Sequence, residues 1–230
     1  AGGHGHGKGH AHWSYEGATG PLHWGAFSEM CAAGKQQSPV NIETAKVKKT
    51  KLPPLELRWK AGLSGTIVNN GHTIKVNTPG GGELVWNGKR FALVQFHFHS
   101  PSEMHVDGRA FPMVAHFVHK AEDGQLAVVA LMFEEGAENA ELAKVWAKMP
   151  AQVGGEARYA GLNPAALLPK DLGYYHFRGS LTTPPCSEGV EWFVLKTPAS
   201  FSPAQWKAFR KLYFGNVRPT QPLNGREIEG

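Results

Sequence analysis

The sequence predicts a mainly β fold, a single domain with short peripheral helices. Its 230 residues include 28 glycines and 16 prolines, which are spread along the chain and favour many turns and short strands over long helices. Residues 66–76 alternate between apolar and polar side chains about Asn70-Gly71, which is the pattern of a β-hairpin. With 41% hydrophobic residues, a chain of this length suits one domain with a full core.

The other predicted elements follow in chain order. Strands rich in apolar residues and bounded by turn residues are expected at 83–87, 91–99, 112–119, 126–133, 174–178 and 190–196. Residues 137–148 are rich in Ala, Glu, Leu and Lys and predict a helix. A second helix is expected over 203–213, with Ser202 as its N-cap and Pro203 in its first turn.

The chain opens with a Gly/His tract that contains His4, His6, His10 and His12. Such a tract is too polar and too rich in glycine to pack, so we expect 1–12 to be disordered and the folded domain to span 13–230. Weak metal binding by the tract is an alternative to a tail without a role. The sequence shows no signal peptide and begins at Ala1, so we interpret it as a processed or trimmed chain.

Charge and hydropathy exclude some classes of function. The net charge of +5 and the pI near 9.2 are mildly basic, and the lysines concentrate in 46–51, which we expect to be a solvated loop. No basic patch with aromatic platforms is visible, so nucleic-acid binding is not expected. No apolar run approaches the roughly 20 residues that a membrane-spanning helix needs.

A histidine pattern on two predicted strands indicates a metal site. In Gln95-Phe96-His97-Phe98-His99, alternate side chains share one face of a strand, so Gln95, His97 and His99 point the same way. His116, in a second apolar strand, can reach that face. Ordinary polar side chains on a half-buried sheet are the alternative, but unpaired imidazoles are costly to bury in apolar strands. Three neutral imidazoles and one open position predict a catalytic zinc site rather than a closed structural one.

The two cysteines, Cys31 and Cys186, both lie in loop-like surroundings. From the sequence alone they are either free thiols or one disulfide. A disulfide would indicate an oxidising compartment.

Ordered motifs run nearly from end to end of the chain. They are Gly20-Pro21-Leu22-His23-Trp24-Gly25, Gln37-Ser38-Pro39-Val40-Asn41-Ile42, Asn69-Asn70-Gly71-His72, Gln95-Phe96-His97-Phe98-His99, Ser102-Glu103-Met104-His105-Val106-Asp107-Gly108, His116-Phe117-Val118-His119, Gly179-Ser180-Leu181-Thr182-Thr183-Pro184-Pro185-Cys186 and Asn216-Val217-Arg218-Pro219-Thr220-Gln221-Pro222-Leu223. In this set and order they closely resemble the α-class carbonic anhydrases, in their bacterial, secreted branch. The resemblance implies a central, mostly antiparallel twisted sheet of about ten strands.

The resemblance also implies an activity, the reversible hydration of CO2 to bicarbonate and a proton. His97, His99 and His116 would hold one Zn2+ per chain, and zinc would lower the pKa of a bound water to about 7, the value known for carbonic anhydrase. The Thr182 hydroxyl would accept a hydrogen bond from the zinc hydroxide nucleophile and donate to Glu103, which orients the attack on CO2. His72 would be the proton shuttle. Ester hydrolysis is a plausible side activity.

Further residues of the site follow from the same resemblance. The substrate pocket would be lined by Val118, Val128, Leu181, Thr182, Thr183, Val190 and Trp192, several of which would also be plain core residues. Waters on the proton path would be ordered by Tyr15, Asn69 and Asn70. Gln95 would accept a hydrogen bond from His97, and the backbone carbonyl of Asn216 one from His99.

One position departs from the family pattern. The family usually places a glutamate two residues before the third histidine ligand, where it accepts a hydrogen bond from that ligand, and this chain has Val114 there. Loss of such a partner typically lowers metal affinity or activity about 10–100-fold. The sequence therefore predicts weaker zinc binding or an altered pH-rate profile.

The resemblance extends to partners, location and alternatives. It implies that Cys31 and Cys186 form one disulfide and that the chain is periplasmic or secreted, possibly as a homodimer. Its substrates would be CO2, water and bicarbonate. The alternatives are a non-catalytic carbonic-anhydrase-like binding domain, in which zinc histidines are usually missing, and a non-haem iron or copper oxygenase, which normally needs a carboxylate ligand.

Overall fold

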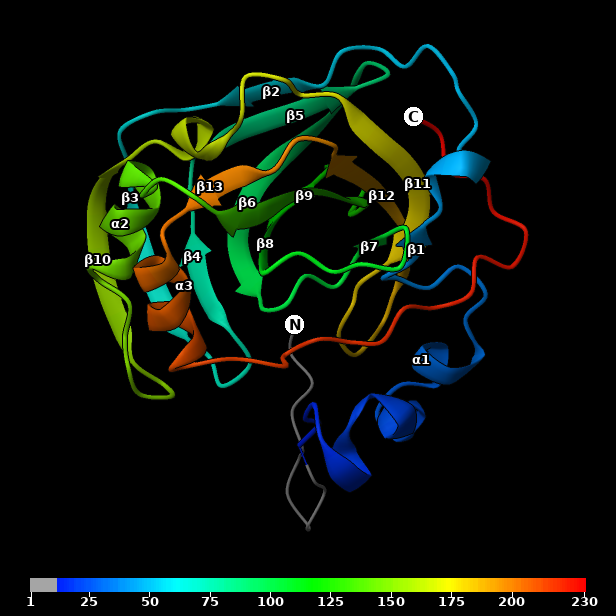
Figure 1. The fold of residues 1–230 in the computed structure, drawn as a ribbon, viewed down its shortest axis with the longest axis horizontal. Helices are drawn as coiled ribbons and strands as arrows, with labels where there is room; N and C mark the ends of the chain where they lie inside the picture. Colours follow the sequence, from blue (N-terminus) through cyan, green and yellow to red (C-terminus); the bar gives the residue numbers. More distant parts are fainter. Residues whose placement is uncertain (1–11) are drawn as a thin grey trace.

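The computed structural model describes residues 12–230, and the tract expected to be disordered lies outside the described residues except for His12. A mixed sheet of eleven strands forms the centre of the molecule (Figure 1). Its strands are β2 (Glu56–Trp59), β3 (Leu63–Asn69), β4 (Ile74–Asn77), β5 (Gly82–Trp86), β6 (Lys89–His99), β8 (Met113–Lys120), β9 (Leu126–Glu135), β10 (Glu156–Leu162), β11 (Tyr174–Ser180), β12 (Glu188–Leu195) and β13 (Ala199–Phe201). A small separate sheet pairs β1 (Asn41–Ile42) with β7 (His105–Val106).

The main sheet runs in the order β10-β3-β4-β6-β8-β9-β12-β11, with β5 beside β6, β2 beside β5 and β13 beside β9. All of its pairs are antiparallel except those that β12 and β13 make with β9. The prediction of a mostly antiparallel sheet is thus confirmed, and so is the hairpin about Asn70-Gly71, which joins β3 to β4. Each strand expected from the sequence is present, with ends shifted by a few residues.

Both faces of the central strands are buried. Seven of the eight residues of β8 are buried, because two apolar clusters cover the sheet from opposite sides. Phe96, Phe98 and Phe117 belong to the larger cluster, whereas Val114, Val118 and other alternate residues belong to the second. The period of two along each strand therefore assigns His97, His99 and His116 to the face of the second cluster.

The helices lie at the periphery and are shorter than expected. Helix α2 spans Ala140–Trp146 rather than 137–148, because the Asn139 side chain caps its N-terminus by accepting from the Leu142 N–H. Helix α3 spans Pro203–Arg210 rather than 203–213, and Ser202 with Gln205 forms the capping box at its start. The two helices contact each other, and α2 also contacts β10 (Figure 1).

Several short elements were not expected from the sequence. They are β1, β2, β7, β10 and β13, helix α1 (Glu29–Ala33), and the 3-10 turns Gly17–Thr19, Pro21–Ala26, Thr44–Lys46 and Pro164–Leu167. Strand β10 lies at an edge of the sheet, where four of its seven residues are exposed, so it lacks the apolar alternation that marks a strand.

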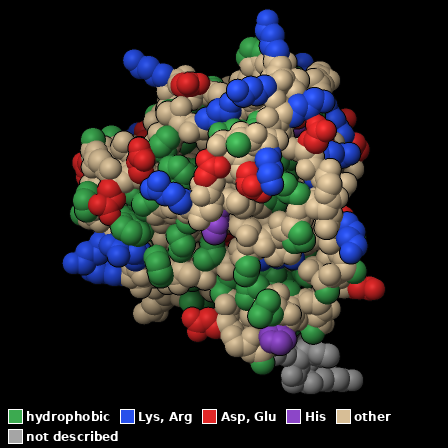
Figure 2. Space-filling model, turned by 45° about the vertical axis from the view of Figure 1, so that its right-hand side comes forward, with side chains coloured by type: hydrophobic (Ala, Val, Ile, Leu, Met, Phe, Trp, Pro, Cys, Tyr) green, Lys and Arg blue, Asp and Glu red, His purple; other side chains and the backbone are tan. Residues whose placement is uncertain are grey.

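Charged side chains of both signs are mixed on the face of the molecule that Figure 2 draws. Figure 2 shows Lys and Arg side chains interspersed with Asp and Glu rather than gathered into one basic patch on this face. No helix among residues 12–230 is long and apolar enough to cross a membrane.

Candidate metal centre

The three predicted histidines meet on two neighbouring central strands. Strand β6 carries His97 and His99, and strand β8 carries His116 directly opposite His97. One nitrogen of each imidazole lies within 4.8 Å of the corresponding nitrogens of the other two. Three imidazole nitrogens at this spacing can share one tetrahedral ion.

Two of the three imidazoles are fixed by acceptors on their outer side. His97 Nδ1 lies 2.9 Å from Gln95 Oε1, and His99 Nδ1 lies 2.7 Å from the backbone oxygen of Asn216. Amide oxygens only accept, so both Nδ1 atoms carry the proton and both Nε2 atoms keep a free lone pair. Both contacts were expected from the sequence, and together they set the tautomers that metal binding needs.

The third imidazole lacks such an acceptor. His116 Nδ1 lies 3.9 Å from Glu103 Oε1, and the opposite nitrogen, Nε2, is buried without a hydrogen-bond partner among the described residues. Val114 packs in an apolar cluster with Met104 and Met132, so nothing there replaces the missing glutamate. A buried donor without an acceptor lowers the free energy of unfolding by about 1–3 kcal/mol.

Burial favours the neutral form of His97 and His116, which is the form that binds metals. The pKa values of His97 and His116 lie well below the ordinary value, first because burial disfavours the imidazolium and second because the neighbouring imidazoles add to the effect. His99 Nε2 and Glu103 Oε1 are also buried without a hydrogen-bond partner among the described residues. The buried lone pair of His99 Nε2, beside the other two imidazoles, fits a bound zinc ion.

Glu103 lies beside the cluster and is fully buried. Its Oε2 accepts from the Arg218 N–H at 2.9 Å, and its Oε1 lies 3.4 Å from His99 Nε2. Burial raises the pKa of Glu103, while His99, a hydrogen bond from the Thr182 side chain and the Arg218 N–H act in the opposite direction. The structure therefore brings Thr182, Glu103 and the histidines together, as expected.

Four of the residues expected to line a substrate pocket form an apolar patch next to His116. Val118, Val128, Val190 and Trp192 belong to one buried cluster, and the Trp192 ring lies edge-to-face against the His116 ring at 5.0 Å. On the adjoining loop Leu181 is half-buried, while Thr182 and Thr183 are buried.

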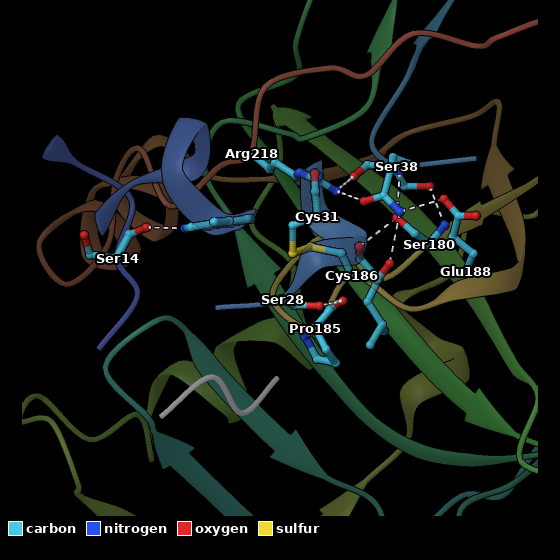
Figure 3. Close-up of a disulfide and its surroundings, with 12 residues drawn as sticks. Ser14, Ser28, Cys31, Ser38, Ser180, Pro185, Cys186, Glu188 and Arg218 are labelled. Atoms are coloured by element: carbon cyan, nitrogen blue, oxygen red, sulfur yellow. Dashed lines mark hydrogen bonds between the residues drawn. A yellow bond between two sulfur atoms is a disulfide. The ribbon is translucent and has the colours of Figure 1, made fainter. Parts of the chain in front are cut away.

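The loop that carries Thr182 is anchored to helix α1. The predicted disulfide between Cys31 and Cys186 is present, and the Ser28 hydroxyl donates to the Pro185 carbonyl at 2.8 Å (Figure 3). Inside the loop, the Cys186 N–H donates to the Thr183 carbonyl at 2.8 Å. These contacts hold the segment just after Thr182 in one conformation.

The contacts of Arg218 were not predicted from the sequence. Its guanidinium donates to Gln37 Oε1, to the Ser38 carbonyl and to the Cys31 carbonyl at 2.8–3.0 Å (Figure 3), and burial lowers its pKa to about 10. Since its own N–H holds Glu103, Arg218 connects the disulfide region to the metal centre. Its place in the motif 216–223 as the one charged residue was the signal that the sequence offered.

His72 lies in the hairpin between β3 and β4. Asn70 Oδ1 accepts from the His72 and Thr73 N–H groups, while the Asn69 side chain contacts the Tyr213 hydroxyl, the Gly71 N–H and the Pro150 carbonyl. Both asparagines therefore hold the loop, and the ordering of water by them stays a prediction. The Tyr15 hydroxyl is buried without a partner among the described residues, and its pKa is raised by burial and then by Glu103.

Comparison with known proteins agrees with this geometry. A family model described as eukaryotic-type carbonic anhydrase matches residues 19–230. A carbonic anhydrase of Pectobacterium atrosepticum is 49% identical over 222 residues, 94% of this chain and 90% of that protein. One of Neisseria gonorrhoeae is 47% identical over 225 residues, 95% of this chain and 88% of that protein.

Solved structures show the same fold. The α-carbonic anhydrase of Thermovibrio ammonificans, in complex with the inhibitor sulfanilamide, matches with a TM-score of 0.93 and 48% identity, over 96% of this chain and all of that chain. The family match spans the sheet, the three histidines and the Thr182 loop. With these histidines on β6 and β8 and these relatives over nearly the whole chain, the protein belongs to the eukaryotic-type (α) carbonic anhydrase family of enzymes.

Proposed function

We propose that this protein catalyses the zinc-dependent, reversible hydration of CO2 to bicarbonate and a proton, with one zinc ion per chain. The observation that carries the proposal is the convergence of three imidazoles, two of which donate from Nδ1 to fixed acceptors, beside the buried Glu103. His97, His99 and His116 would hold the ion. When bound, zinc supplies a Lewis acid that makes hydroxide available near neutral pH.

The other residues orient the reactants and exclude water. Glu103, held by the Arg218 N–H, would accept a hydrogen bond from the Thr182 hydroxyl, which would leave the Thr182 oxygen as an acceptor toward the substrate side. The apolar wall of Val118, Val128 and Trp192 suits CO2, which is apolar and needs no hydrogen-bond donors. Orientation in a dry site of this kind is a large contribution to a bimolecular rate.

His72 would carry the proton from the site toward solvent. An imidazole changes charge near neutral pH and so can accept and release a proton in each turnover. Its position in the hairpin, 6.3 Å from Tyr15 between ring centroids, supports this role. Replacement of His72 by Ala should lower kcat in dilute buffer and leave kcat/KM for CO2 unchanged, which buffer-dependent stopped-flow kinetics measure.

The disulfide supports a periplasmic or extracellular location, because such bonds persist in oxidising compartments. A homodimer stays a prediction from the family resemblance, and sedimentation velocity at several protein concentrations tests it.

Stopped-flow CO2 hydration on metal-analysed protein tests the main proposal. The protein is assayed as loaded, after removal of zinc with a chelator, and after reconstitution. Hydration should disappear with the metal and return with it. One bound zinc per chain without hydration would instead favour the non-catalytic binding domain, and His116→Ala serves as the control that removes one ligand.

A further inference from the structure

A second imidazole touches the proposed proton shuttle. His12, which precedes Trp13 directly, has its Nε2 atom 2.6 Å from the Nε2 atom of His72. The two rings are nearly parallel, with centroids 4.7 Å apart and an angle of 19° between their planes. This separation is within hydrogen-bond distance, so one ring donates and the other accepts.

An aromatic platform fixes this arrangement. The Trp13 ring stacks on the His72 ring at 3.6 Å between centroids and 9° between planes, and Trp13 is itself fully buried against Trp24 and Tyr15. The main chain of His72 is held as well, since its carbonyl accepts from Asn216 Nδ2 at 3.0 Å. The ring of His72 is therefore positioned with its Nε2 edge toward His12.

The two histidines differ in their exposure to solvent. His72 is only 8% exposed, whereas His12 is exposed. A shuttle must finally give its proton to a buffer molecule, and that molecule must come within hydrogen-bond distance of the donor nitrogen. A buffer molecule can make that contact with His12 far more easily than with a ring that is stacked on Trp13 and covered.

We propose that His12 is a second proton-relay residue, which takes the proton from His72 and passes it to buffer. This rests on the proposed shuttle role of His72. The proton that reaches His72 makes it an imidazolium. Its Nε2–H bond then breaks as the proton forms a bond with the lone pair of His12 Nε2, and His72 returns to the neutral imidazole. His12 releases the proton to a buffer base and becomes neutral in turn, so no other reactant is needed.

The transfer suits two imidazoles. Both side chains are imidazoles, whose ordinary pKa lies near neutral pH. Proton transfer between two groups of the same kind needs little driving force in either direction. The same relay in reverse would deliver the proton that bicarbonate dehydration consumes.

Kinetics of four variants test the proposal on the zinc-loaded enzyme. The variants are His12→Gln, His72→Ala, the double variant and His23→Gln, whose exposed histidine lies in the same N-terminal region. In limiting buffer, His12→Gln should lower kcat for CO2 hydration about tenfold, with kcat/KM unchanged because that parameter excludes the proton exit. High concentrations of imidazole buffer should restore kcat, and His23→Gln should behave as the wild type.

The double variant decides whether the two residues act in series. If they do, His12→Gln adds no loss once His72 has been replaced. Three results would each overturn the proposal. In the first, the losses of kcat in the two single variants multiply in the double variant. In the others, His12→Gln keeps the wild-type kcat in limiting buffer, or its kcat/KM falls in parallel with kcat. If His72→Ala also leaves kcat intact, the shuttle itself fails; if only His12→Gln does so, the shuttle stands and the relay fails.

A measurement without turnover tests the contact directly. In 15N NMR titrations of the side chains, His12 and His72 should titrate as a coupled pair in two apparent steps. His12→Gln should convert His72 to a single step, while His23→Gln should leave both steps unchanged. Independent titration of His12 and His72 in the wild type would show that the proton is not shared and would overturn the proposal.

Discussion

Acidification should destabilise this protein in part through His119, a fully buried residue on the face of β8 opposite to His116. The Trp59 Nε1–H donates to His119 Nε2 at 3.0 Å, and His119 Nδ1 donates to the Ala127 carbonyl at 3.1 Å. The Trp59 contact needs the neutral ring, because a second proton on Nε2 would face the Trp59 N–H, whereas Nδ1 donates to Ala127 in either form. Burial, only partly offset by the backbone contacts, lowers the pKa of His119 to about 4.

The sign and the size of the effect follow from this pKa. In the unfolded chain the ring has an ordinary pKa of about 6.5, so acid protonates the unfolded state first. The stability that the neutral ring provides is complete above pH 6.5 and is lost as the pH falls toward 4. A difference of about 2.5 pKa units corresponds to about 3 kcal/mol in total, of which about 2.5 kcal/mol is already lost at pH 4.5.

Urea unfolding followed by tryptophan fluorescence at pH 7.5 and 4.5 measures this loss. His119→Gln keeps one acceptor and one donor but does not titrate, so its free energy of unfolding should fall by about 2.5 kcal/mol less than that of the wild type. Other titrating groups are common to both proteins and cancel. His23→Gln, at an exposed position, should follow the wild type. Equal losses in wild type and His119→Gln would refute the reasoning.

Three further predictions concern the metal centre, the disulfide and a helix cap. Val114→Glu should give His116 Nε2 an acceptor and slow zinc release to a chelator about 10–100-fold; an unchanged release rate would contradict the interpretation of the orphaned nitrogen. Replacement of Cys31 and Cys186 by serine opens a loop of 155 residues. By the chain-entropy model, chemical denaturation should show a free energy of unfolding lower by about 5 kcal/mol. A decrease below about 1 kcal/mol would rule that model out here. Ser202→Ala should remove the α3 cap and reduce stability by about 1 kcal/mol, with the exposed Ser200→Ala as the comparison; equal stability of the two variants would argue against the cap.

The centre of the fold could be predicted from the sequence because its strands are long and buried. The alternation of Phe96 and Phe98 with His97 and His99 identified β6 and its polar face directly. Peripheral elements such as β10 and α1 could not be predicted in the same way, because exposed short segments carry no apolar period. The helix ends were wrong for a related reason, since they depend on the local caps at Asn139 and Ser202.

The site, too, contains residues that could be predicted from the sequence and contacts that could not. The three clustered histidines, Gln95 and Thr182 belong to motifs that can be recognised one by one. The contact between His12 and His72 brings together residues 60 positions apart in the sequence, and the several bonds of Arg218 depend on three backbone segments. Relations of this kind are created by the tertiary structure, so no local pattern contains them.

The origin of the three histidines from only two adjacent strands also bears on what the metal does for the whole molecule. Because β6 and β8 are already joined by their own hydrogen bonds, an ion between them closes no long stretch of chain and adds little to the connectivity of the fold. The Cys31–Cys186 bond, which ties together segments 155 residues apart, does the opposite. Zinc bound at this site would therefore constrain the backbone little, and the long-range covalent constraint on the chain is the disulfide.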